Sequence, residues 1–593
     1  MNMKKTKIAG LFAALAMMST GFISCKGDYK VKNFHSEIFG ENTYIFSPED
    51  DPEKVQSILD EIYSKQEKSQ FGNDRYAIYF MPGIYDKAIN VHVGFYTHVA
   101  GLGKLPLDTK INSLDSLARW INSNPRNHNA CCNFWREVEN IEMQSDTVWA
   151  VSQATSMRRV KVDGNVHFHD EGGWCSGGFS ANSVFEGASD SGSQQQWLSR
   201  NNEYHHWNSS NWNIVMVGDK RQEDLKGYWP EKAYTDVEKT PLIREKPFLV
   251  YDEKEGFGVY VPGFRTESVG ITWSSGAEGD FIPLEKFYVS HPGDSAEKIN
   301  AELKKGKHLF LTPGIYELSE PIVVSKADTI VLGTGLATIV PVNGNECMTV
   351  ADEDGIIIAG ILFDAGQVKS KNLLVVGEEG CVKSHAFSPI SLSDLYFRVG
   401  GTDTEKPAKV ETCLTINSSN VVGDNFWIWR ADHGKQVGWD LNEADYGLVV
   451  NGNDVITYAL MVEHFKKHET VWNGNRGKIY MYQCEIPYDV PSQEVWMSHD
   501  NTKQGYASIT VSPDVTDFDA RGIGIYLLNR HAEVNLESPV EVPDAEGVRI
   551  ENICTVMIGG FPGMSHIVND KGKPVMKGVS REILTEYCNG KAR

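Results

Sequence analysis

Two glutamates in the second half of the chain stand among side chains that could bind a sugar. Glu463 lies in the segment VEHF and Glu485 in YQCEIPYD, a separation of 22 residues. The same stretch supplies Trp472, Tyr482 and Tyr488, which could stack on a sugar ring or hydrogen-bond to it. Cleavage of a glycosidic bond needs such a setting, because a protonated carboxyl group delivers a proton to the departing oxygen. The residues alone leave open the alternative that Glu485 caps a corner and the aromatic side chains fill a core.

An internal repeat indicates which kind of element would place the two glutamates together. The PGIY tetrads begin at Pro82 and Pro313, 231 residues apart, and the GLG and GTG triplets begin at Gly101 and Gly333, 232 residues apart. The repeated blocks are PEKVQSILDEI (52–62), RYAIYFMPGIYD (75–86) and VHVGFYTHVAGLG (91–103), followed by SAEKINAELKKG (295–306), KHLFLTPGIYEL (307–318) and IVVSKADTIVLGTG (322–335). Three blocks in matching order and spacing indicate a duplicated domain.

Each copy begins with an amphipathic segment and continues as many short β-branched and aromatic runs. The apolar residues between Val55 and Ile62 fall on one face of a helix. Short β runs with Gly, Asn and Asp at their corners are typical of a parallel β-helix, whose open end such a helix would cap. The predicted fold is therefore all-β, with two tandem right-handed parallel β-helix domains side by side and the two glutamates on neighbouring turns. A pair of antiparallel sandwiches is the competing interpretation.

The repeat also sets the predicted domain boundaries. We expect the first β-helix domain over residues 30–280 and the second, which carries both glutamates, over residues 281–570. The segment at 281–294 resembles a linker that feeds the second copy. The polar tail at 571–593 is expected to add a last turn and a short helix.

Residues 1–25 are typical of a lipoprotein signal peptide rather than of a folded segment. Lys4, Lys5 and Lys7 precede an apolar stretch that is too short and too interrupted by small residues to span a membrane. This stretch ends in FISC (22–25), a lipobox pattern in which Cys25 would be acylated after cleavage. The prediction is a lipid-anchored protein of the cell envelope, at the outer membrane, and an ordinary secretory signal is the alternative.

The charge of the chain narrows the class of partner. Its 79 acidic and 57 basic residues give a net charge of −22, which argues against nucleic acid and anionic lipid as partners. A polyanionic polysaccharide is also disfavoured, so a neutral polysaccharide is the expected substrate. We expect contact with a membrane only through the lipid anchor, no cofactor, and a monomeric protein.

The metal-ligating residue types do not form a convincing site in the sequence. Apart from Cys25 there are nine cysteines, without CxxC spacing, so neither a disulfide framework nor a zinc site is indicated. Asp432 and His433 adjoin in WRADHG, but neighbouring side chains on a strand point to opposite faces. We therefore predict no metal, and expect Asp432 to order the substrate site or to hold Arg430.

Taken together, these blocks resemble glycoside hydrolase family 55, the β-1,3-glucanases built from tandem β-helices with a pectate-lyase-like fold. The resemblance covers most of the chain after the signal segment. The matching stretches of the first half are NFWREVENIEM (133–143), WAVSQATSMRRVKV (149–162), GGWCSGGFSANS (172–183), SQQQWLSRN (193–201), NSSNWNIVMVG (208–218) and EKPFLVYDEKEGFGVYVPGFR (245–265). The second half supplies WRADHG, GLVVNG, VEHF, WNG and YQCEIPYD.

The resemblance implies a role for each of several residues. Glu485 matches the family's general acid, and Glu463 matches a second carboxylate that lines the same cleft between the two domains. The family inverts the anomeric centre without a conventional carboxylate base, and a glutamine and a serine position the attacking water. Gln153 in VSQA matches that glutamine, and Ser176 in CSGGF matches the serine. Gln195, Gln196 and Trp197 form a polar and aromatic segment suited to sugar hydroxyls.

Two other functions compete with the hydrolase. Many parallel β-helices are polysaccharide lyases. Elimination next to a uronate requires a cationic site or bound calcium to neutralise the uronate. This chain is strongly acidic and has no dense Lys/Arg cluster near the glutamates. A non-catalytic surface glycan-binding protein could keep the fold and lose the reaction. Glu485, Glu463 and Gln153 occurring together argue against that second alternative, and the fold alone does not separate the three functions.

Overall fold

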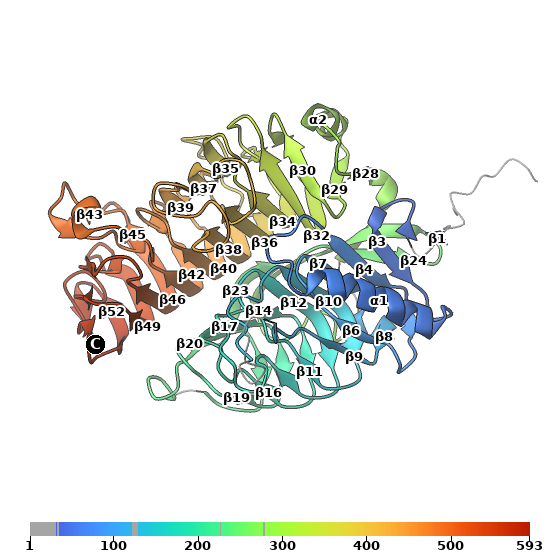
Figure 1. The fold of residues 1–593 in the computed structure, drawn as a ribbon, viewed down its shortest axis with the longest axis horizontal. Helices are drawn as coiled ribbons and strands as arrows, with labels where there is room; N and C mark the ends of the chain where they lie inside the picture. Colours follow the sequence, from blue (N-terminus) through green and yellow to red (C-terminus); the bar gives the residue numbers. More distant parts are fainter. Residues whose placement is uncertain (1–30, 33–34, 121–127, 226, 277–278) are drawn as a thin grey trace, which may run out of the picture.

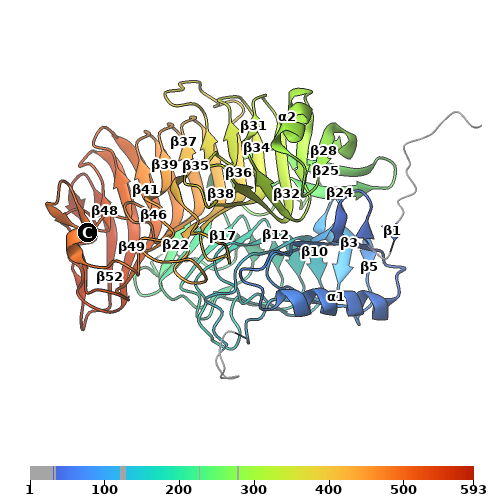
Figure 2. The same cartoon turned by 45° about the horizontal axis from the view of Figure 1, so that its top comes forward.

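The computed structural model describes residues 31–32, 35–120, 128–225, 227–276 and 279–593. Two parallel β-helices lie side by side along their length, the first in blue to green and the second in green to red (Figure 1; Figure 2). The fold predicted from the repeat is confirmed, because successive turns pair in parallel and in register in both halves. No helix in the described ranges is long and apolar enough to cross a membrane. The lipobox and Cys25 lie outside the described residues.

The first β-helix presents one long sheet toward its partner and a second, narrower sheet on another face. Parallel pairing runs through the main sheet from β3 to β22. Its strands are β3 (Gly40–Phe46), β4 (Tyr76–Phe80), β7 (Thr97–Gly101), β10 (Arg136–Met143), β12 (Thr155–Val162), β14 (Phe179–Ala181), β17 (Gln196–Arg200), β20 (Asn213–Val217) and β22 (Tyr234–Val237). The narrower sheet consists of β11 (Thr147–Val148), β13 (Val166–His167), β16 (Ser189–Asp190) and β19 (Trp207–Asn208).

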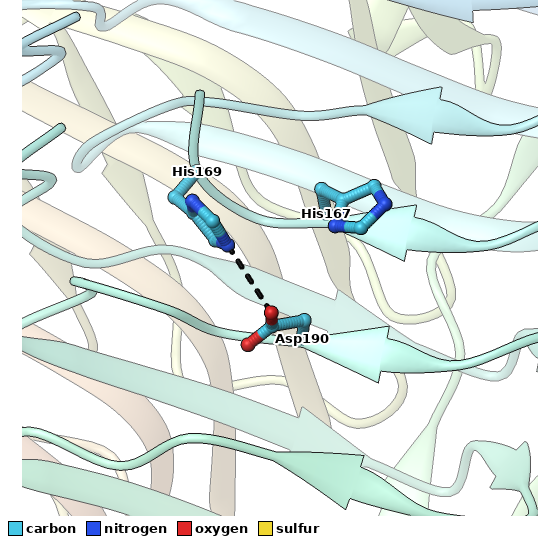
Figure 3. Close-up of side chains that lie close together, drawn as sticks. All are labelled: His167, His169 and Asp190. Carbon is cyan, nitrogen blue, oxygen red and sulfur yellow. Dashed lines mark hydrogen bonds and ion pairs between the residues drawn. The ribbon is translucent and has the colours of Figure 1, made fainter. Parts of the chain in front are cut away.

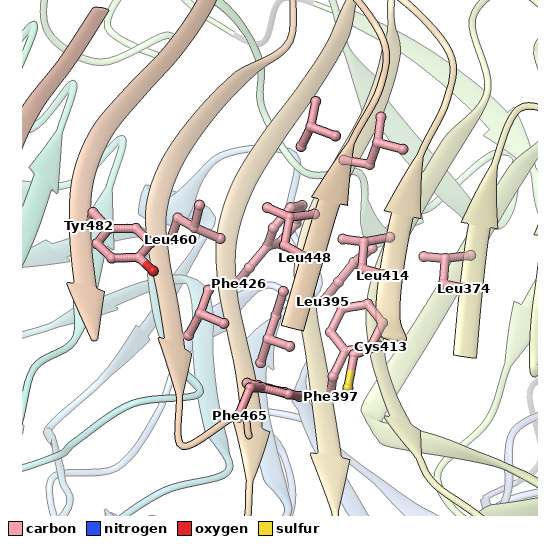
Figure 4. Packing of buried hydrophobic residues seen from close by; sticks show 14 of the residues in the cluster. Leu374, Leu395, Phe397, Cys413, Leu414, Phe426, Leu448, Leu460, Phe465 and Tyr482 are labelled. Carbon is pink, nitrogen blue, oxygen red and sulfur yellow. The ribbon is translucent and has the colours of Figure 1, made fainter. Parts of the chain in front are cut away.

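The second β-helix repeats this plan with longer strands. Its main sheet contains β28 (Phe287–Ser290), β29 (His308–Leu311), β32 (Ile330–Pro341), β34 (Ile357–Asp364), β36 (Ile390–Val399), β38 (Val421–Arg430), β40 (Ile456–Glu463), β42 (Gly477–Glu485), β46 (Asp517–Leu528) and β49 (Gly547–Gly559). The other sheet contains β31 (Ile322–Val324), β33 (Met348–Val350), β35 (Ser370–Val376), β37 (Val410–Ile416), β39 (Tyr446–Val450), β41 (Thr470–Trp472), β45 (Ile509–Val511) and β48 (Val540–Glu541). Leucine and phenylalanine side chains from successive turns stack between the two sheets and form the core (Figure 4).

The duplicated blocks occupy equivalent positions in the two β-helices. The predicted helices are α1 (Pro52–Gln66), capped by Asp51, and α2 (Ala296–Lys304), capped by Ser295. In the two PGIY turns, Gly83 and Gly314 have φ angles of +145° and +154°. A Cβ at either glycine would lie within 2.3 Å of a proline ring, so both turns need glycine for the same two reasons.

The segment between the two β-helices differs from the predicted linker. Antiparallel strands occupy much of residues 240–276 and 279–283, namely β23 (Thr240–Arg244), β24 (Phe248–Asp252), β25 (Gly256–Pro262), β26 (Phe264–Ser268) and β27 (Gly279–Pro283). The predicted boundary at residue 281 therefore lies inside β27, and the second β-helix begins with β28. The tail forms β52 (Arg581–Cys588), which pairs antiparallel with β49, instead of the expected helix, because that pairing covers the open edge of the main sheet.

Candidate active site

The two predicted glutamates lie side by side at the ends of neighbouring strands. Glu463 ends β40 and Glu485 ends β42, and the two residues are partners in the parallel register. The same row continues to Trp429 on β38 and to Tyr526 on β46. Because side chains alternate along a strand, all four residues of the row project from the same face of the sheet. This face packs against the first β-helix.

The first β-helix brings Gln153 to Glu463. Gln153 lies two residues before β12, and its Nε2 donates a hydrogen bond of 2.8 Å to Oε1 of Glu463, 310 residues away in the sequence. Both side chains are buried. Since this bond uses the amide N–H of Gln153, its carbonyl oxygen is available as an acceptor. The predicted pair therefore comes together across the interface between the two β-helices.

Ser176 lies in a hydrogen-bonded cluster on the same edge of the first β-helix. Its Oγ donates to the carbonyl of Cys131 at 3.3 Å and lies 3.3 Å from the Oγ of Ser152. Burial raises the pKa of the Cys131 thiol to about 12. A hydrogen bond from Ser176 lowers this pKa, and the negative charge of Glu485 raises it further. The Cys131 side chain thus lies close to both Ser176 and Glu485.

Glu485 is held in a protonation state suited to proton donation. Its side chain is 13% exposed, whereas that of Glu463 is buried. Burial, aided by the negative charge of Asp432, raises the pKa of Glu485 to about 7, although the hydroxyl of Tyr488 donates a hydrogen bond to its Oε2. His464 approaches the same oxygen at 3.8 Å, but burial lowers its pKa to about 4. A neutral His464 does not stabilise the carboxylate form of Glu485.

Burial disfavours the ionised form of Glu463. Burial, and next the charge of Glu485, raise the pKa of Glu463 well above its usual range. Two acidic groups in neighbouring register positions disfavour a second negative charge. The site therefore contains one acid with a pKa of about 7 and a second acid whose pKa burial also raises.

Asp432 has different partners from the predicted one. It does not bind Arg430, which instead forms an ion pair with Asp489 at 2.6 Å. Asp432 accepts from Arg530 at 3.0 Å and from Nδ1 of His433 at 2.7 Å. The expectation that Asp432 and His433 point to opposite faces is also wrong, because β38 ends at Arg430 and strand alternation does not extend beyond it.

Three of the predicted substrate-binding aromatic side chains lie in the cores instead. Trp197 packs against Phe168 inside the first β-helix, with 4.2 Å between the ring centroids. Trp472 and Tyr482 are fully buried inside the second, where Tyr482 lies beside Leu460 (Figure 4). These placements correct the prediction, since an inward side chain of a solenoid turn cannot reach a ligand outside.

The other predicted substrate-binding residues lie near the site in different environments. Tyr488 is buried and bonded to Glu485. Gln196 is buried and donates to the carbonyl of Ser176, so it shapes the loop that carries that serine. Gln195 is half-buried, and its backbone N–H donates to the carbonyl of Cys175.

An aromatic row next to the acids, exposed at one end, was missed in the sequence. Trp174 is 49% exposed, and its ring lies 6.2 Å from that of Trp212. The Trp212 ring lies 4.9 Å from the ring of Tyr526, the register partner of Glu485. In this row, Trp174–Trp212–Tyr526, the exposed Trp174 and the half-buried Trp212 give a sugar chain a surface for stacking, and the buried Tyr526 connects them to the acids. The GGWCSGG and NSSNWN segments were noted as family blocks, but nothing in the sequence showed that their tryptophans meet.

Among the described residues, His167, His169 and Asp190 come close enough to be considered as ligands of one metal ion (Figure 3). The backbone N–H of Gly172 donates to Nδ1 of His169 at 2.8 Å. The proton of the neutral ring is therefore on Nε2, which faces Oδ2 of Asp190 at 3.3 Å. A metal-binding histidine instead donates its second N–H to an acceptor. The trio is arranged as a hydrogen-bonded cluster rather than as a metal site.

A second group of this kind, also within the described ranges, surrounds Asp170 with His128 and Glu171. Arg119 already forms a bidentate ion pair with Asp170, at 2.8 and 3.0 Å. A guanidinium at this position neutralises the carboxylate and repels a cation.

Comparisons with known proteins agree with this architecture. A family model described as the LAM55 pectate lyase-like domain matches residues 287–485. The chain is 41% identical over 542 residues to a protein named Exo-beta-1,3-glucanase from Streptomyces sp. (strain SirexAA-E / ActE), covering 90% of this chain and 87% of that protein. The structure of sacteLam55A from Streptomyces sp. SirexAA-E superposes with a TM-score of 0.88 at 39% identity, over 93% of this chain and 98% of that one. A variant of sacteLam55A in complex with glucose also has a TM-score of 0.88, at 38% identity over 94% of this chain and 100% of that one. This degree of identity over nearly the whole length shows that the chain is a glycoside hydrolase that belongs to glycoside hydrolase family 55.

Proposed function

We propose that this chain hydrolyses β-1,3-glucan with inversion at the interface between its two β-helices, releasing glucose units from chain ends. The observation that carries the proposal is the state of Glu485, a partly exposed acid with a pKa of about 7. It lies beside Glu463, whose pKa is also raised and which accepts a hydrogen bond from Gln153 of the other β-helix. A carboxyl group protonated near neutral pH can donate its proton to a departing sugar oxygen.

In the proposed reaction, the bond between the anomeric carbon and the departing oxygen breaks as that oxygen takes the proton of Glu485. A water molecule on the opposite face of the ring, held by the carbonyl oxygen of Gln153, forms the new bond to the anomeric carbon. Ser176 accepts the proton that this water loses while its own hydroxyl proton passes toward Ser152, 3.3 Å away, and one proton leaves along this path to solvent. Glu485 regains its proton from solvent. Glu463 keeps the amide of Gln153 in place, so that its carbonyl oxygen faces the water.

The relatives support the substrate and the mode of action. The Streptomyces relative is named an exo-β-1,3-glucanase, and a variant of sacteLam55A from the same genus binds glucose. The net charge of −22 favours a neutral glucan over an acidic polysaccharide.

The test is a screen of the purified protein without its signal segment on linear β-1,3-, β-1,6- and mixed-linkage glucans, with product sizing. Glucose released from β-1,3-glucan, with the α anomer appearing first by NMR, is the expected result. Appearance of the β anomer first would mean retention and a nucleophile that the proposal lacks. Unsaturated products that absorb in the ultraviolet would replace hydrolysis with elimination.

We also propose that the protein is exported, anchored to the cell envelope through an acylated Cys25, and monomeric, with its membrane contact limited to the lipid. The signal segment and lipobox support the anchor, and the contribution of all the site residues by one chain supports the monomer. Cys25→Ser should release soluble protein, abolish acyl labelling and leave the fold intact. Continued labelling of this variant would contradict the proposed anchor, and light scattering of the released protein tests the monomer.

A further inference from the structure

A cavity of about 620 Å³ opens between the two β-helices away from the acids. The first β-helix and the adjoining antiparallel segment contribute Trp229, Asp236, Glu238 and Glu267 to its lining, and the second β-helix contributes Arg521 and Asn552. Its volume falls within the range of about 300–1,000 Å³ that is usual for ligand sites. None of these residues takes part in the proposed hydrolysis.

The cavity lies at the opposite edge of the interface from Glu485. Glu485 is the register partner of Tyr526, and Arg521 precedes Tyr526 by five residues on the same strand. At the usual rise per residue this corresponds to a separation of about 16 Å along β46. On the first β-helix, the cavity is lined by β22 and the residues that follow it, at the last turn, whereas Gln153 precedes β12, several turns earlier.

Packed side chains and backbone separate the cavity from the acids. Nδ2 of Asn213 bridges the carbonyls of Tyr482 and Gly522, at 3.3 and 3.0 Å. A Cβ at Gly522 would lie 2.3 Å from the side chain of Val215, so the two β-helices touch closely there. A glucan chain at the acids therefore cannot continue through the interface into the cavity, and anything bound in the cavity occupies a separate site.

The lining combines two aromatic residues, Trp229 and the buried Tyr234, with charged groups that include ion pairs. Nε1 of Trp229 donates to Thr585 on β52 at 3.1 Å, which fixes the half-buried ring. Asp236 is paired with Arg221, and Arg521 with Asp519 at 3.0 Å and with Glu551 at 3.1 Å. Such pairs offer hydrogen-bond donors and acceptors without a net charge that would select an ion.

The remaining polar groups at the cavity lie near its opening. Glu238, Lys239 and Glu267 are exposed, and Lys239 and Glu267 approach each other at 3.9 Å. The amide of Asn552 reaches Thr235 at 3.1 Å. A fixed aromatic ring beside carboxylates and an amide is the combination that holds a pyranose, whose apolar face stacks and whose hydroxyls both donate and accept.

We propose that this cavity is a second, non-catalytic site that binds a segment of neutral glucan, with Trp229 as the stacking residue. This inference rests on the proposed function for the identity of the sugar polymer. A separate site would hold another part of a long or insoluble glucan while a chain end is hydrolysed. Its benefit depends on substrate length, because a short oligosaccharide can occupy only one of the two sites at a time.

The direct test is a binding measurement in the Glu485→Gln background, so that the glucan is not consumed. Calorimetry with a soluble β-1,3-glucan should show two classes of site, and adding Trp229→Ala should remove one class or weaken it about tenfold, a loss of about 1.4 kcal/mol. Glu267→Ala should weaken the same class without touching the Trp229–Thr585 contact. Unchanged binding in both variants, with unchanged thermal melting, would overturn the second site.

Activity provides the second readout. Trp229→Ala alone should keep kcat/KM on a β-1,3-linked glucose trimer within about twofold, and should lower it severalfold on insoluble glucan. Phe387→Ala, which removes a fully exposed aromatic ring elsewhere on the second β-helix, is the matched control and should change neither value. Equal loss on the trimer and on the polymer would assign Trp229 to folding or catalysis and contradict a separate binding site.

The outcomes also separate this inference from the proposed function. If the wild-type protein hydrolyses no β-1,3-glucan, the proposed function fails, and the binding assay is run with β-1,6- and mixed-linkage glucans. If it hydrolyses the trimer but Trp229→Ala and Glu267→Ala bind every glucan as well as their parent does, only the second site fails.

Discussion

Two regions of the interface between the β-helices bury acidic groups, and the pKa values of these groups shift in opposite directions in the two regions. In one region Arg158 forms ion pairs with Asp394 at 2.7 Å and with Asp424 at 2.6 Å, and Arg200 binds Glu245 at 2.7 Å. Burial alone would raise the pKa values of Asp394 and Glu245, but the arginines hold both below their usual range. We call this cluster of Arg158, Arg200, Asp394, Asp424 and Glu245 the ion-pair network.

At the acid site, burial has the opposite outcome. Glu463 and Glu485 have no arginine or lysine as a direct ion-pair partner among the described residues, and burial raises the pKa of both. The nearest basic group of Glu485, His464, is neutral because it is buried as well. The comparison indicates that partner cations, rather than burial itself, decide whether an acid at this interface is ionised. One region can thereby fix the two β-helices together while the other keeps a proton to donate.

The largest expected effect comes from removing that proton. Glu485→Gln keeps the shape of the side chain, but its amide cannot transfer a proton to the departing oxygen. The value of kcat on β-1,3-glucan should therefore fall by about 10²–10⁴. KM should change little, because the amide can still contact the sugar. An aryl glycoside whose leaving group needs no protonation should lose much less activity.

Gln153→Ala is the matched comparison for the acid variant. It should reduce turnover of the glucan and of the aryl glycoside alike, because water placement matters whatever the leaving group is. Equal losses on both substrates for Glu485→Gln would remove that residue from the role of acid.

Breaking the ion-pair network should mainly affect folding. Arg158→Met leaves the buried Asp394 without its main cation, and Asp424 with Arg200 alone, which should lower the free energy of unfolding by about 3–5 kcal/mol. Chemical denaturation measures this loss. Arg476→Met removes an exposed arginine, paired with Asp454 at 2.7 Å, and should change stability by less than about 1 kcal/mol. A small effect of Arg158→Met would mean that the network does not hold the two β-helices together.

The raised pKa of Glu485 predicts two pH dependences in the same window. Because the acid must be protonated, kcat/KM for glucan should fall about tenfold per pH unit above pH 7. The folded-state pKa lies above the ordinary value of 4.5, so the folded protein holds this proton more tightly than the unfolded chain. The associated stabilisation is present below pH 4.5 and is lost as the pH rises through 7.

Glu485→Gln isolates that contribution. Relative to the wild type, the variant should gain stability between pH 4.5 and pH 8, by an amount on the order of 3 kcal/mol, since one pKa unit corresponds to about 1.4 kcal/mol. Denaturant titrations at the two pH values measure the difference. Parallel stability curves for the two proteins would contradict a raised pKa at Glu485.

The repeat and the alternation of strands explain how much of this could be predicted from the sequence. The repeat determines the β-helices and places Glu463 and Glu485 in register, because one turn separates them. Tyr482 was predicted to bind the sugar together with Glu485. The two residues are an odd number of positions apart on β42, however, and therefore point to opposite sides of the sheet. That error could have been avoided with the sequence alone.

Contacts between the two β-helices could not be predicted in this way. Gln153 meets Glu463, and Trp212 meets Tyr526, through the packing of one sheet on another. No periodicity in the sequence encodes the relative position of two packed sheets, and the family resemblance alone pointed to Gln153. The partner of Asp432 was predicted wrongly for another reason, because Arg530 lies 98 residues away on a later turn of the same β-helix.

The smallest effect concerns the row Trp174–Trp212–Tyr526. Trp174 is the exposed end of the row, and Tyr526 is the register partner of Glu485, so a sugar stacked on Trp174 would lie beyond the unit that is cleaved. Trp174→Ala should raise KM for β-1,3-glucan by about three- to tenfold, the equivalent of an aromatic contact of about 0.5–1.5 kcal/mol, with kcat nearly unchanged. Initial-rate kinetics separate the two constants. Phe387→Ala again controls for loss of an exposed ring. A fall in kcat with unchanged KM would mean that Trp174 positions the reacting groups, and would place the aromatic row within the acid site rather than beside it.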